Sequence, residues 1–415
     1  MSLNLDKSTW KRVRLGDVIR RSRTQADPAN GDVDRYVGGG HIDTDSLTIE
    51  RFGDVNDGQM GSTFTYLFQP GQILFVSARP YLRKSGVVNF SGVVADKTYV
   101  LDAVPENGLL QEFLPFVLAS DHFIAYATTV ATGSMNPRLL WGQLQRYEFD
   151  LPPLDEQKRL ANILWALERH GQAVVDERVR SLRLYEATRI ALLAIGPDGD
   201  WRSVEWDAEQ VNRWTDKVPD GWSRETIASV GRVRSGATPN RTEQARYFDG
   251  GTIPWVKTLD LNEGVLRATD ECITSVAVAE TSVKVLLAGT VLVAMYGGFG
   301  QIGRTARLGV DAATNQAVSA VVDLRSDVSP EFLHEVLKAG RPKWRRVAAS
   351  SRKDPNITKR DVEGFDFPLP PPELQSRILS ILATLQSGTD ALDAEASGIR
   401  ELRSSLLAEV FGGAK

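Results

Sequence analysis

Apolar positions recur at intervals of seven near the end of the chain. One series starts at Ile378, and a second series starts at Leu374. This spacing is typical of a helix that buries one face against another helix. The second series is interrupted at Gly388 and Glu395, so the pattern predicts a weaker seam there. The positions are Ile378, Leu385, Leu392, Ile399 and Leu406 in the first series, and Leu374, Ile381 and Leu402 in the second.

An earlier segment carries a broader apolar stripe. Each of the two segments extends over about 40 residues, so each would form a helix roughly 60 Å long. An exposed stripe of that length is unfavourable in water, and the simplest partner for one helix is the other. The alternative is that each helix packs on its own globular part. The apolar positions of the earlier segment are Leu160, Ile163, Leu164, Leu167, Val174, Val175, Leu182 and Ile190.

The two helical segments begin with related sequences. FDLPPLDEQKRLANILWAL (149–167) matches FPLPPPELQSRILSILATL (367–385) at nine of 19 positions. We call the shift in numbering that pairs Phe149 with Phe367 the repeat offset. The same offset pairs GQILFV (71–76) with GTVLVA (289–294). The chain is therefore a tandem duplication. A duplication about a pseudo-twofold axis would place the two helices antiparallel.

Each half has the same plan. About 140 residues of short strand-like runs separated by turn residues precede a proline-rich LPP, which suits the first turn of a helix. The predicted fold is α+β, with two mixed α/β domains in tandem and two long antiparallel coiled-coil helices about a pseudo-twofold axis. An acidic linker joins the halves. We assign residues 1–150 and 222–368 to the domains, 151–195 and 369–411 to the helices, and 196–221 to the linker.

Composition excludes several classes of function. The chain has 415 residues, of which 42% are hydrophobic and 25% charged, as in globular proteins with more than one domain. No apolar run reaches the roughly 18–20 residues of a membrane span, and the N-terminal segment lacks a secretory signal. Cys272 is the only cysteine, so we expect a reducing cytoplasm. The four histidines share no ligand spacing with Cys272, which argues against a zinc site.

One motif suggests a nucleotide-binding enzyme. GFGQIG (298–303) is a literal G-x-G-x-x-G after an apolar run, and Asp323 lies where a dinucleotide site has its acid. However, the repeat has RPYL (79–82) where this half has GGFG, and Gly309 with turn-forming residues follows where an amphipathic helix is required. We therefore interpret the glycines as a tight strand–loop–strand connection with positive φ angles.

Other catalytic patterns are weak. Glu156 and Lys158 resemble part of a nuclease site, but their repeat counterparts, Leu374 and Ser376, retain neither charge. A favourable position for negative charge at a helix N-terminus explains Glu156 better. The sequence contains no P-loop and no amino-methyltransferase motif. We predict no catalytic residue in this chain.

Segregated charge is the stronger signal. Residues 338–360 carry nine bases and one acid, a net +8 within a protein of net charge −4. Such a segment can neutralise DNA phosphates. The matching segment 119–142 is nearly uncharged, so the two halves would expose different loops on one scaffold. Smaller basic clusters lie at 11–23 and 79–84, and an ordinary solvated face explains the first equally well.

Four segments of the second half and the starts of the two helices carry a resemblance to a known family. They are VRSGATPNR (233–241), IPWVKTLDLNEG (253–264), GTVLVAMYGGFGQIG (289–303), ATNQAV (313–318) and two copies of LPP-x-x-x-Q. In these the chain resembles the specificity subunits of type I restriction-modification enzymes. The first half lacks the W-V-K and glycine-loop sequences, so the resemblance is weaker there.

The resemblance implies a protein that does no bond chemistry. Each domain would be a target-recognition domain that reads half of an asymmetric, bipartite DNA site in the major groove, and the helix pair would set the spacing. Two S-adenosylmethionine-dependent modification subunits would dock against it, and up to two ATP-dependent restriction subunits would join them. We expect no cofactor in this chain, since S-adenosylmethionine, ATP and Mg would belong to those partners. We also expect no membrane association.

The candidate DNA-binding residues are basic and polar side chains of the exposed loops. No metal ligand is predicted. Two other functions stay open, namely a coiled-coil adaptor that binds protein partners, and an enzyme that binds a nucleotide or S-adenosylmethionine at 298–303. The candidates are Lys343, Arg345, Arg346, Arg352, Lys353, Asn356, Lys359 and Lys257 in the second half, and Arg79, Arg83, Lys84, Ser134, Asn136 and Arg138 in the first.

Overall fold

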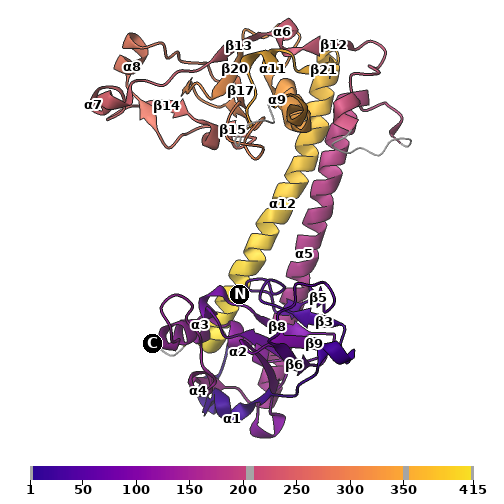
Figure 1. Ribbon diagram of the computed structural model, residues 1–415, viewed down its shortest axis with the longest axis vertical. Coiled ribbons are helices and arrows are strands. Elements are labelled where there is room, and N and C mark those ends of the chain that lie inside the picture. The colour runs from indigo at the N-terminus through magenta and orange to yellow at the C-terminus, as the bar shows by residue number, and fades with distance from the viewer. Residues whose placement is uncertain (1–2, 202–209, 349–354, 413–415) are drawn as a thin grey trace. The chain divides into compact units, whose positions relative to one another are not determined.

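The computed structural model describes residues 3–201, 210–348 and 355–412. The chain divides into two compact units (Figure 1). The first unit comprises residues 1–177 and 392–415, and the second comprises residues 178–391. Residues 202–209 of the predicted linker lie outside the described part. Each unit therefore contains one globular part and one end of each long helix.

A five-stranded sheet with the order β2-β10-β7-β8-β4 forms the centre of the first unit. Neighbouring strands are antiparallel except for β4, which runs parallel to β8. Ile73, Leu74 and Phe75 of β7 are almost fully buried, which explains why this strand is a continuous apolar run. The strands are β2 (Ile19–Ser22), β10 (Thr98–Ala103), β7 (Ile73–Val76), β8 (Ser85–Val88) and β4 (Thr48–Ile49).

Shorter elements complete the first unit. A four-stranded sheet has the order β5-β3-β9-β6, and β1 pairs with β11 just before the long helix begins. These strands are β5 (Gly53–Asp54), β3 (Arg35–Val37), β9 (Gly92–Ala95), β6 (Phe64–Phe68), β1 (Lys11–Arg14) and β11 (Glu148–Leu151). The helices are α1 (Leu15–Val18), α2 (Leu114–Ala119), α3 (Asp121–Val130) and α4 (Trp141–Gln145).

The second unit repeats this arrangement. Its five-stranded sheet has the order β13-β20-β17-β18-β15, again with one parallel edge strand, β15, and β12 pairs with β21 before the second long helix. The strands are β13 (Arg232–Ser235), β20 (Val318–Val322), β17 (Val291–Ala294), β18 (Thr305–Leu308), β15 (Val265–Leu266), β12 (Ser223–Thr226) and β21 (Asp366–Leu369). The repeated sheet order confirms the tandem α+β fold.

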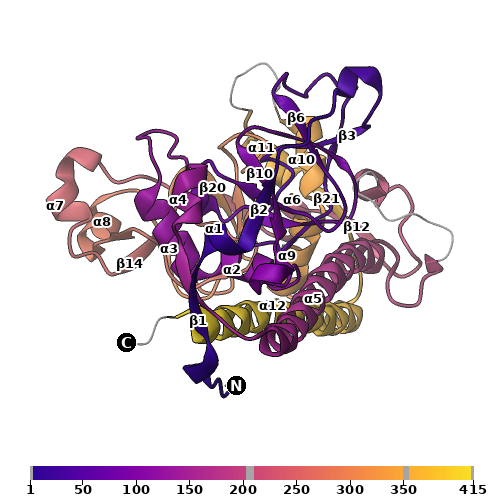
Figure 2. The ribbon, with the colours of Figure 1, turned by 90° about the horizontal axis from the view of Figure 1, so that it is seen from below.

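A small lobe of the second unit lies beside this sheet. Strand β14 runs antiparallel to β16 and parallel to β19, and α7 and α8 lie next to it (Figures 1 and 2). The lobe contains β14 (Ile253–Val256), β16 (Cys272–Ile273), β19 (Ala313–Thr314), α7 (Gln244–Tyr247) and α8 (Ser275–Glu280). The remaining helices are α6 (Ile227–Val230), α9 (Pro330–Ala339), α10 (Trp344–Val347) and α11 (Lys359–Glu363).

Both predicted long helices are present as continuous elements, α5 (Leu154–Ile195) and α12 (Pro372–Phe411). They pack side by side and antiparallel within each unit (Figure 2). In the first unit, His170 Nε2 lies 3.0 Å from Glu395 Oε1, and Arg403 donates to Glu168 at 2.9 Å. In the second unit, Ser181 Oγ lies 3.2 Å from Thr389 Oγ1. The helices therefore contact each other, as the duplication predicts. They also pack on the globular parts, as the alternative predicts, since Leu164 and Leu406 belong to the core of the first unit and Leu382 belongs to the core of the second.

The seam of α12 differs from the predicted one in its second series. Gly388 and Glu395 are exposed, so they do not weaken the seam. The buried series lies one residue later along the helix, at Leu382, Thr389, Ala396, Arg403 and Val410. Thr389 is only 2% exposed because it is hydrogen-bonded across the seam, and the mostly buried Arg403 is ion-paired there. The pattern of aliphatic residues alone missed this series because three of its five members are small or polar.

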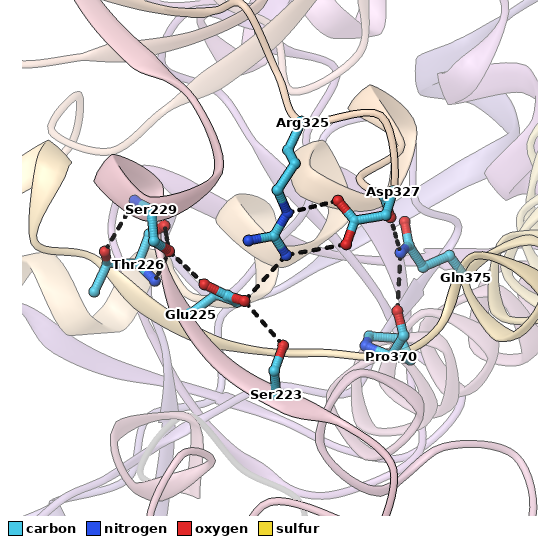
Figure 3. Close-up of polar contacts among 8 residues, drawn as sticks. All are labelled: Ser223, Glu225, Thr226, Ser229, Arg325, Asp327, Pro370 and Gln375. Atoms are coloured by element: carbon cyan, nitrogen blue, oxygen red, sulfur yellow. Dashed lines mark hydrogen bonds and ion pairs between the residues drawn. The ribbon is translucent and has the colours of Figure 1, made fainter.

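A buried glutamine ties the start of each long helix to the domain before it. Gln375 is 1% exposed, and its amide donates to the carbonyls of Pro370 at 2.9 Å and Asp327 at 2.7 Å (Figure 3). The amide oxygen accepts from Ser329 N at 2.9 Å. Gln157 makes the same three kinds of bond, to Pro152 O, Gly108 O and Leu110 N. The LPP-x-x-x-Q segments thus connect each long helix to its domain through buried hydrogen bonds. We call this connection the joint.

Ion pairs extend this joint in the second unit. Arg325 bonds both carboxylate oxygens of Asp327, at 2.6 and 3.0 Å, and donates to Glu225 on β12 at 3.0 Å (Figure 3). Asp327 in turn presents its backbone carbonyl to Gln375. The first strand of the domain (β12), the segment before α9 and the start of α12 are therefore held by one network.

Candidate nucleic-acid interface

The glycine motif lies in a β-hairpin loop. Residues 295–304 connect the antiparallel strands β17 and β18, and a strand follows Gly303 directly. A dinucleotide-binding loop needs a helix at that point, with its N-terminus against the pyrophosphate. The structure therefore confirms the strand–loop–strand interpretation of the glycines.

The corresponding loop of the first unit, residues 77–84, has the same backbone reversal without glycine. Gly297 and Gly303 have φ angles of 111° and 71°, and Arg79 and Arg83 have φ angles of 52° and 53° at the matching ends of the other loop. A left-handed conformation is costly for arginine and must be supported by other contacts. Arg83 has such support, because its guanidinium pairs with Asp45 and Asp121 and donates to Ala119 O at 2.7 Å.

Glycine is required at one of these positions for a second reason. A Cβ atom on Gly303 would lie 2.0 Å from Cδ1 of Trp344, which is 2% exposed. The loop therefore packs directly on Trp344 of the basic segment. Residue 303 has no room for a side chain there. This contact joins two features that are separate in the sequence.

In each unit, a second segment is hydrogen-bonded to the first residue of the hairpin loop, and the two segments correspond through the repeat offset. Leu139 N donates to Ser77 O at 2.8 Å, and Ile357 N donates to Met295 O at 3.0 Å. Donor and acceptor of the second bond are the repeat counterparts of donor and acceptor of the first. Each unit thus presents one composite surface made of the hairpin loop and the segment before Leu139 or Ile357. We call these surfaces the first and second reading surfaces.

An exposed aromatic residue occupies the same repeat position in both loops. Tyr81 is 47% exposed and Phe299 is 51% exposed, and the repeat offset pairs them. The sequences around them differ completely, RPYL against GGFG. Packing does not explain the aromatic residues, because half of each side chain faces solvent. The repeat alignment contained this signal, but sequence reasoning did not use it.

Lys343 differs from the other predicted contacts of the second reading surface. Its side chain is only 13% exposed, its ammonium is ion-paired with Asp366, and it donates to Asp366 O at 2.8 Å. It also lies over the rings of Trp214 and Phe365, at 5.4 and 5.1 Å from their centroids. Burial lowers the pKa of Lys343. Because many bases lie in this segment, the sequence did not distinguish Lys343, which packs in the core, from the exposed bases beside it.

Other predicted residues of this surface are accessible. Arg345, Arg346 and Lys359 are exposed, and Asn356 is partly exposed. Arg345 and Phe299 border a hollow of about 380 Å³ between the loop and α10. Arg341 holds the loop in place, since it donates to Gly300 O and pairs with Glu263, both at 2.7 Å. The predicted residues Arg352 and Lys353 lie outside the described part of the chain.

Some predicted residues of the first reading surface face solvent. Arg79, Ser134 and Asn136 are exposed, and Arg79 Nε donates to Asn136 Oδ1 at 2.8 Å. Met135, next to them, is 88% exposed. The loop and the nearly uncharged segment therefore meet, as the second unit's counterparts do.

Three other predicted bases of the first unit hold the loop together. Arg83 pairs with Asp45 and Asp121, as described above. Arg138 donates to Ser77 Oγ at 3.1 Å and pairs with Asp96 at 3.2 Å. Lys84 donates to Gly39 O. These side chains are committed to the fold of the unit, so Arg83, Lys84 and Arg138 are weaker candidates than Arg79.

Three of the segments that carry the family resemblance meet at the small lobe, those containing GATPNR, WVK and ATNQ. Gly236 lies against Thr314, Trp255 donates to Ala237 O at 3.1 Å, and Ala237 N donates to Thr314 O at 2.9 Å. Lys257, a predicted DNA contact, pairs with Glu271 at 2.8 Å. The hydrogen bonds from Arg241 and Lys257 lower the pKa of Glu271 to about 2. The lobe thus accounts structurally for the GATPNR, WVK and ATNQ sequences.

The basic cluster near the N-terminus is paired in part. Arg12 and Arg14 on β1 form ion pairs with Asp150 and Glu148 on β11, at 3.3 and 3.2 Å. Arg21 is partly buried, 4.4 Å from the ring centroid of Tyr99. Contacts within the unit therefore explain these three arginines of the cluster.

The described residues contain no group of three or more histidine, cysteine, aspartate or glutamate side chains that could hold a metal ion. Glu156, considered above as part of a nuclease pattern, bonds Arg159 at 2.7 Å, and that bond lowers its pKa. Within the described ranges, no helix has the length and apolar character needed to cross a membrane.

Comparison with known proteins gives consistent matches in both halves. A family model described as "Type I restriction modification DNA specificity domain" matches residues 7–174 and 219–397. The type I restriction enzyme MjaIX specificity subunit of Methanocaldococcus jannaschii is 25% identical over 44% of this chain and 40% of its own length. The type I restriction enzyme HindI specificity subunit of Haemophilus influenzae is 21% identical over 98% of this chain and 99% of that protein. This chain thus spans about two fifths of the first relative and nearly all of the second.

A solved structure has a similar fold over the whole chain. It comes from work on the "structural basis underlying complex assembly and conformational transition of the type I R-M system". It is 22% identical, covers 97% of this chain and 98% of its own, and has a TM-score of 0.64. The likeness supports the tandem arrangement of two domains and two long helices.

Proposed function

This chain belongs to the family of type I restriction modification DNA specificity domains, and on that premise we propose that it is the DNA-recognition subunit of a type I restriction-modification complex. Each unit reads one half of a bipartite, asymmetric DNA site. The subunit itself catalyses no reaction. Methylation and cleavage belong to partner subunits that carry S-adenosylmethionine, ATP and Mg. We place the complex in the cytoplasm.

One observation carries the proposal. The two reading surfaces share the same hairpin, the same left-handed positions and the same backbone bond to the flanking segment, yet they differ in chemistry. The second surface exposes Arg345 and Arg346, whereas the first exposes Ser134 and Asn136. A common scaffold with different exposed groups is what two readers of different sequences on one duplex require.

The structure refines the set of proposed contacts. We retain the exposed side chains, because a group must reach phosphate or a base edge to contribute to binding. We remove the bases whose side chains are bound within the chain and add Tyr81 and Phe299. The removed bases are Lys343, Lys257, Arg83, Lys84 and Arg138. The proposed contacts are now Arg345, Arg346, Asn356, Lys359 and Phe299 in the second unit, and Arg79, Tyr81, Ser134 and Asn136 in the first. Arg352 and Lys353 stay as proposals from the sequence.

The long helices set the distance between the two half-sites in this proposal. α5 and α12 contain 42 and 40 residues. Two modification subunits dock against them, and up to two restriction subunits complete the assembly. We keep 1–150 and 222–368 as the target-recognition domains, with 151–195 and 369–411 as the spacer helices. Changing both helices by whole turns should change the spacer and leave both half-sites unchanged.

A domain exchange tests the proposal. Residues 222–368 are replaced by the second domain of another specificity subunit, and the methylated sequences are read from the genome of cells that express the complex. We expect one half-site to change while the other half-site and the spacer stay the same. A change in both half-sites, or methylation that does not depend on this chain, would contradict the proposal.

The alternatives lose support from the site geometry. The hairpin after β17 has no helix to bind a pyrophosphate, so a nucleotide-binding enzyme is disfavoured. A coiled-coil adaptor for protein partners would not need two different reading surfaces. Salt-dependent binding of duplex DNA by the assembled complex separates an adaptor from a DNA reader.

A further inference from the structure

A hollow of about 490 Å³ opens in the second unit where α9 meets α12. Its wall on α12 is apolar apart from Gln386, and its wall on α9 is polar. Two acids of the wall are paired with bases, Glu331 with Arg307 at 3.0 Å and Glu335 with Lys338 at 2.9 Å. The lining residues used below are Ala383, Leu379 and Leu382 on α12 and Glu331, His334 and Glu335 on α9.

The first unit fills the corresponding space with a tryptophan. Trp165 on α5 packs edge-to-face on Phe116, with ring centroids 5.2 Å apart, and its Nε1 donates to Glu112 O at 2.9 Å. The helix alignment pairs Trp165 with Ala383 through the repeat offset. The second unit therefore lacks an indole ring where the first unit has one.

The facing residues also correspond. EFLPFVL (112–118) and EFLHEVL (331–337) align with one another, which pairs Glu112 with Glu331 and Phe116 with Glu335. Both Glu331 and Glu335 line the hollow. The residues that would surround an indole are thus present in the second unit, with a carboxylate in place of one ring.

Two buried polar atoms in this wall have no hydrogen-bond partner among the described residues. They are Glu335 Oε2 and His334 Nε2, and His334 is only 5% exposed. Arg189 NH1 forms a long ion pair with Glu335 Oε2, at 3.7 Å. A buried acceptor without a hydrogen bond loses the free energy of the bonds it makes with water in the unfolded chain. A ligand that brought an N–H or O–H group would recover this free energy.

We propose that this hollow binds a tryptophan side chain of a protein partner, in the place that Trp165 occupies in the first unit. Its ring would pack on Leu379, Leu382 and Ala383. Its single N–H would donate to one acceptor of the α9 wall, either the carbonyl of Glu331, which corresponds to Glu112 O, or Glu335 Oε2. DNA is a poor fit, because the lining holds three acids against two bases and offers no excess positive charge. The inference rests on the proposed function in one respect, that the partner is the modification subunit.

The repeat supplies the test variants. Ala383→Trp gives the second unit the residue of the first, and Ala383→Trp with Glu335→Phe copies the Trp165–Phe116 pair. Ala394→Trp is the matched control, since Ala394 is an exposed alanine of α12 that does not line the hollow. Because the first unit accommodates this pair, we expect the double variant to melt no lower than the wild type. Melting curves of Ala383→Trp itself, recorded beside those of the double variant, separate a loss of binding from a loss of folding.

The first measurement uses the full chain co-expressed with its modification subunit. We expect Ala383→Trp to weaken the affinity between them at least tenfold and Ala394→Trp to change it less than twofold. Equal affinity in the Ala383→Trp and wild-type complexes would overturn the inference. So would a loss confined to DNA binding, which would identify the hollow as part of the DNA surface.

The second measurement needs no partner and uses indole itself as the probe. Saturation-transfer NMR on the wild-type full chain should show saturable binding, with a Kd of about 1 mM. The signal should disappear in Ala383→Trp and persist in Ala394→Trp. No indole binding by the wild type would refute the docking site. Failure of the wild-type chain to assemble or to bind DNA would instead count against the proposed function.

Discussion

Neutralising the two exposed arginines of the basic segment and neutralising Lys343 should have opposite effects on DNA binding and on stability. Arg345 and Arg346 are exposed on α10, beside Phe299 of the hairpin loop. Each base that contacts a phosphate contributes about 0.9 to the slope of log affinity against log salt concentration. If both arginines contact phosphate, Arg345→Gln with Arg346→Gln should reduce that slope by about 1.8. The free energy of unfolding should change by less than about 0.5 kcal/mol, as for other exposed side chains.

Lys343→Gln should show the reverse pattern. Its side chain is 13% exposed and ion-paired with Asp366, whose carboxylate would lose that partner. Asp366 would still be bound by Arg224 and Thr215, so the loss corresponds to one hydrogen bond to a charged group and should lower the free energy of unfolding by about 2 kcal/mol. The salt slope should not change, because Lys343 does not face solvent.

Fluorescence anisotropy with a labelled duplex that contains the methylated site, measured over a series of salt concentrations, gives the slopes, and urea unfolding gives the stabilities. The decisive result is the contrast between the two variants. An unchanged slope in the double arginine variant would remove α10 from the DNA interface. A reduced slope with unchanged stability in Lys343→Gln would show that the lysine leaves its ion pair to bind DNA, against our reasoning.

Three further outcomes follow from the contacts described above. Gln375→Met removes three hydrogen bonds at nearly constant volume and should lower the free energy of unfolding by about 3 kcal/mol, whereas Ser376→Ala, one residue along, should lower it by less than about 1 kcal/mol in the same urea titration. Gly303→Ala places a methyl group against Trp344 and should lower the melting temperature by several degrees in calorimetry. Burial and nearby cations lower the pKa of His334 from 6.5 to about 3, so the folded state binds fewer protons than the unfolded state between these values. Stability should therefore fall as the pH drops from 6.5 to about 3, and His334→Gln should flatten that part of the urea-derived stability profile.

Much of the architecture could be predicted because it repeats. The repeat offset and the heptads between Ile378 and Leu406 were enough to predict two long helices and the domains before them. The second buried series of α12 was missed, because the partners of Thr389 and Arg403 lie on other elements, namely α5 for both residues and Asp45 for Arg403. A polar residue at a seam position cannot be distinguished from a surface residue until its partner is known.

For the reading surfaces too, the sequence predicted the segments involved but not the contacts between them. The basic segment and the hairpin loop were both singled out from sequence, but nothing in the sequence joined Gly303 to Trp344. Net charge over a window does not distinguish Lys343, which faces Asp366, from Arg345, which faces solvent. The matched positions of Tyr81 and Phe299 were visible in the alignment, but their exposure was not.

The amino-acid sequence by itself determined the duplication, the α+β class and the two helices, because these depend on local periodicity and on similarity between segments of one chain. Only the tertiary structure decided which charges are paired, which polar residues are buried, and where one unit has a ring and the other a hollow. Those properties depend on which side chains meet across elements far apart in the chain. Trp165 and Ala383 occupy the same position in two copies of one helix, and only the facing residues on α2 and α9 show what that difference means.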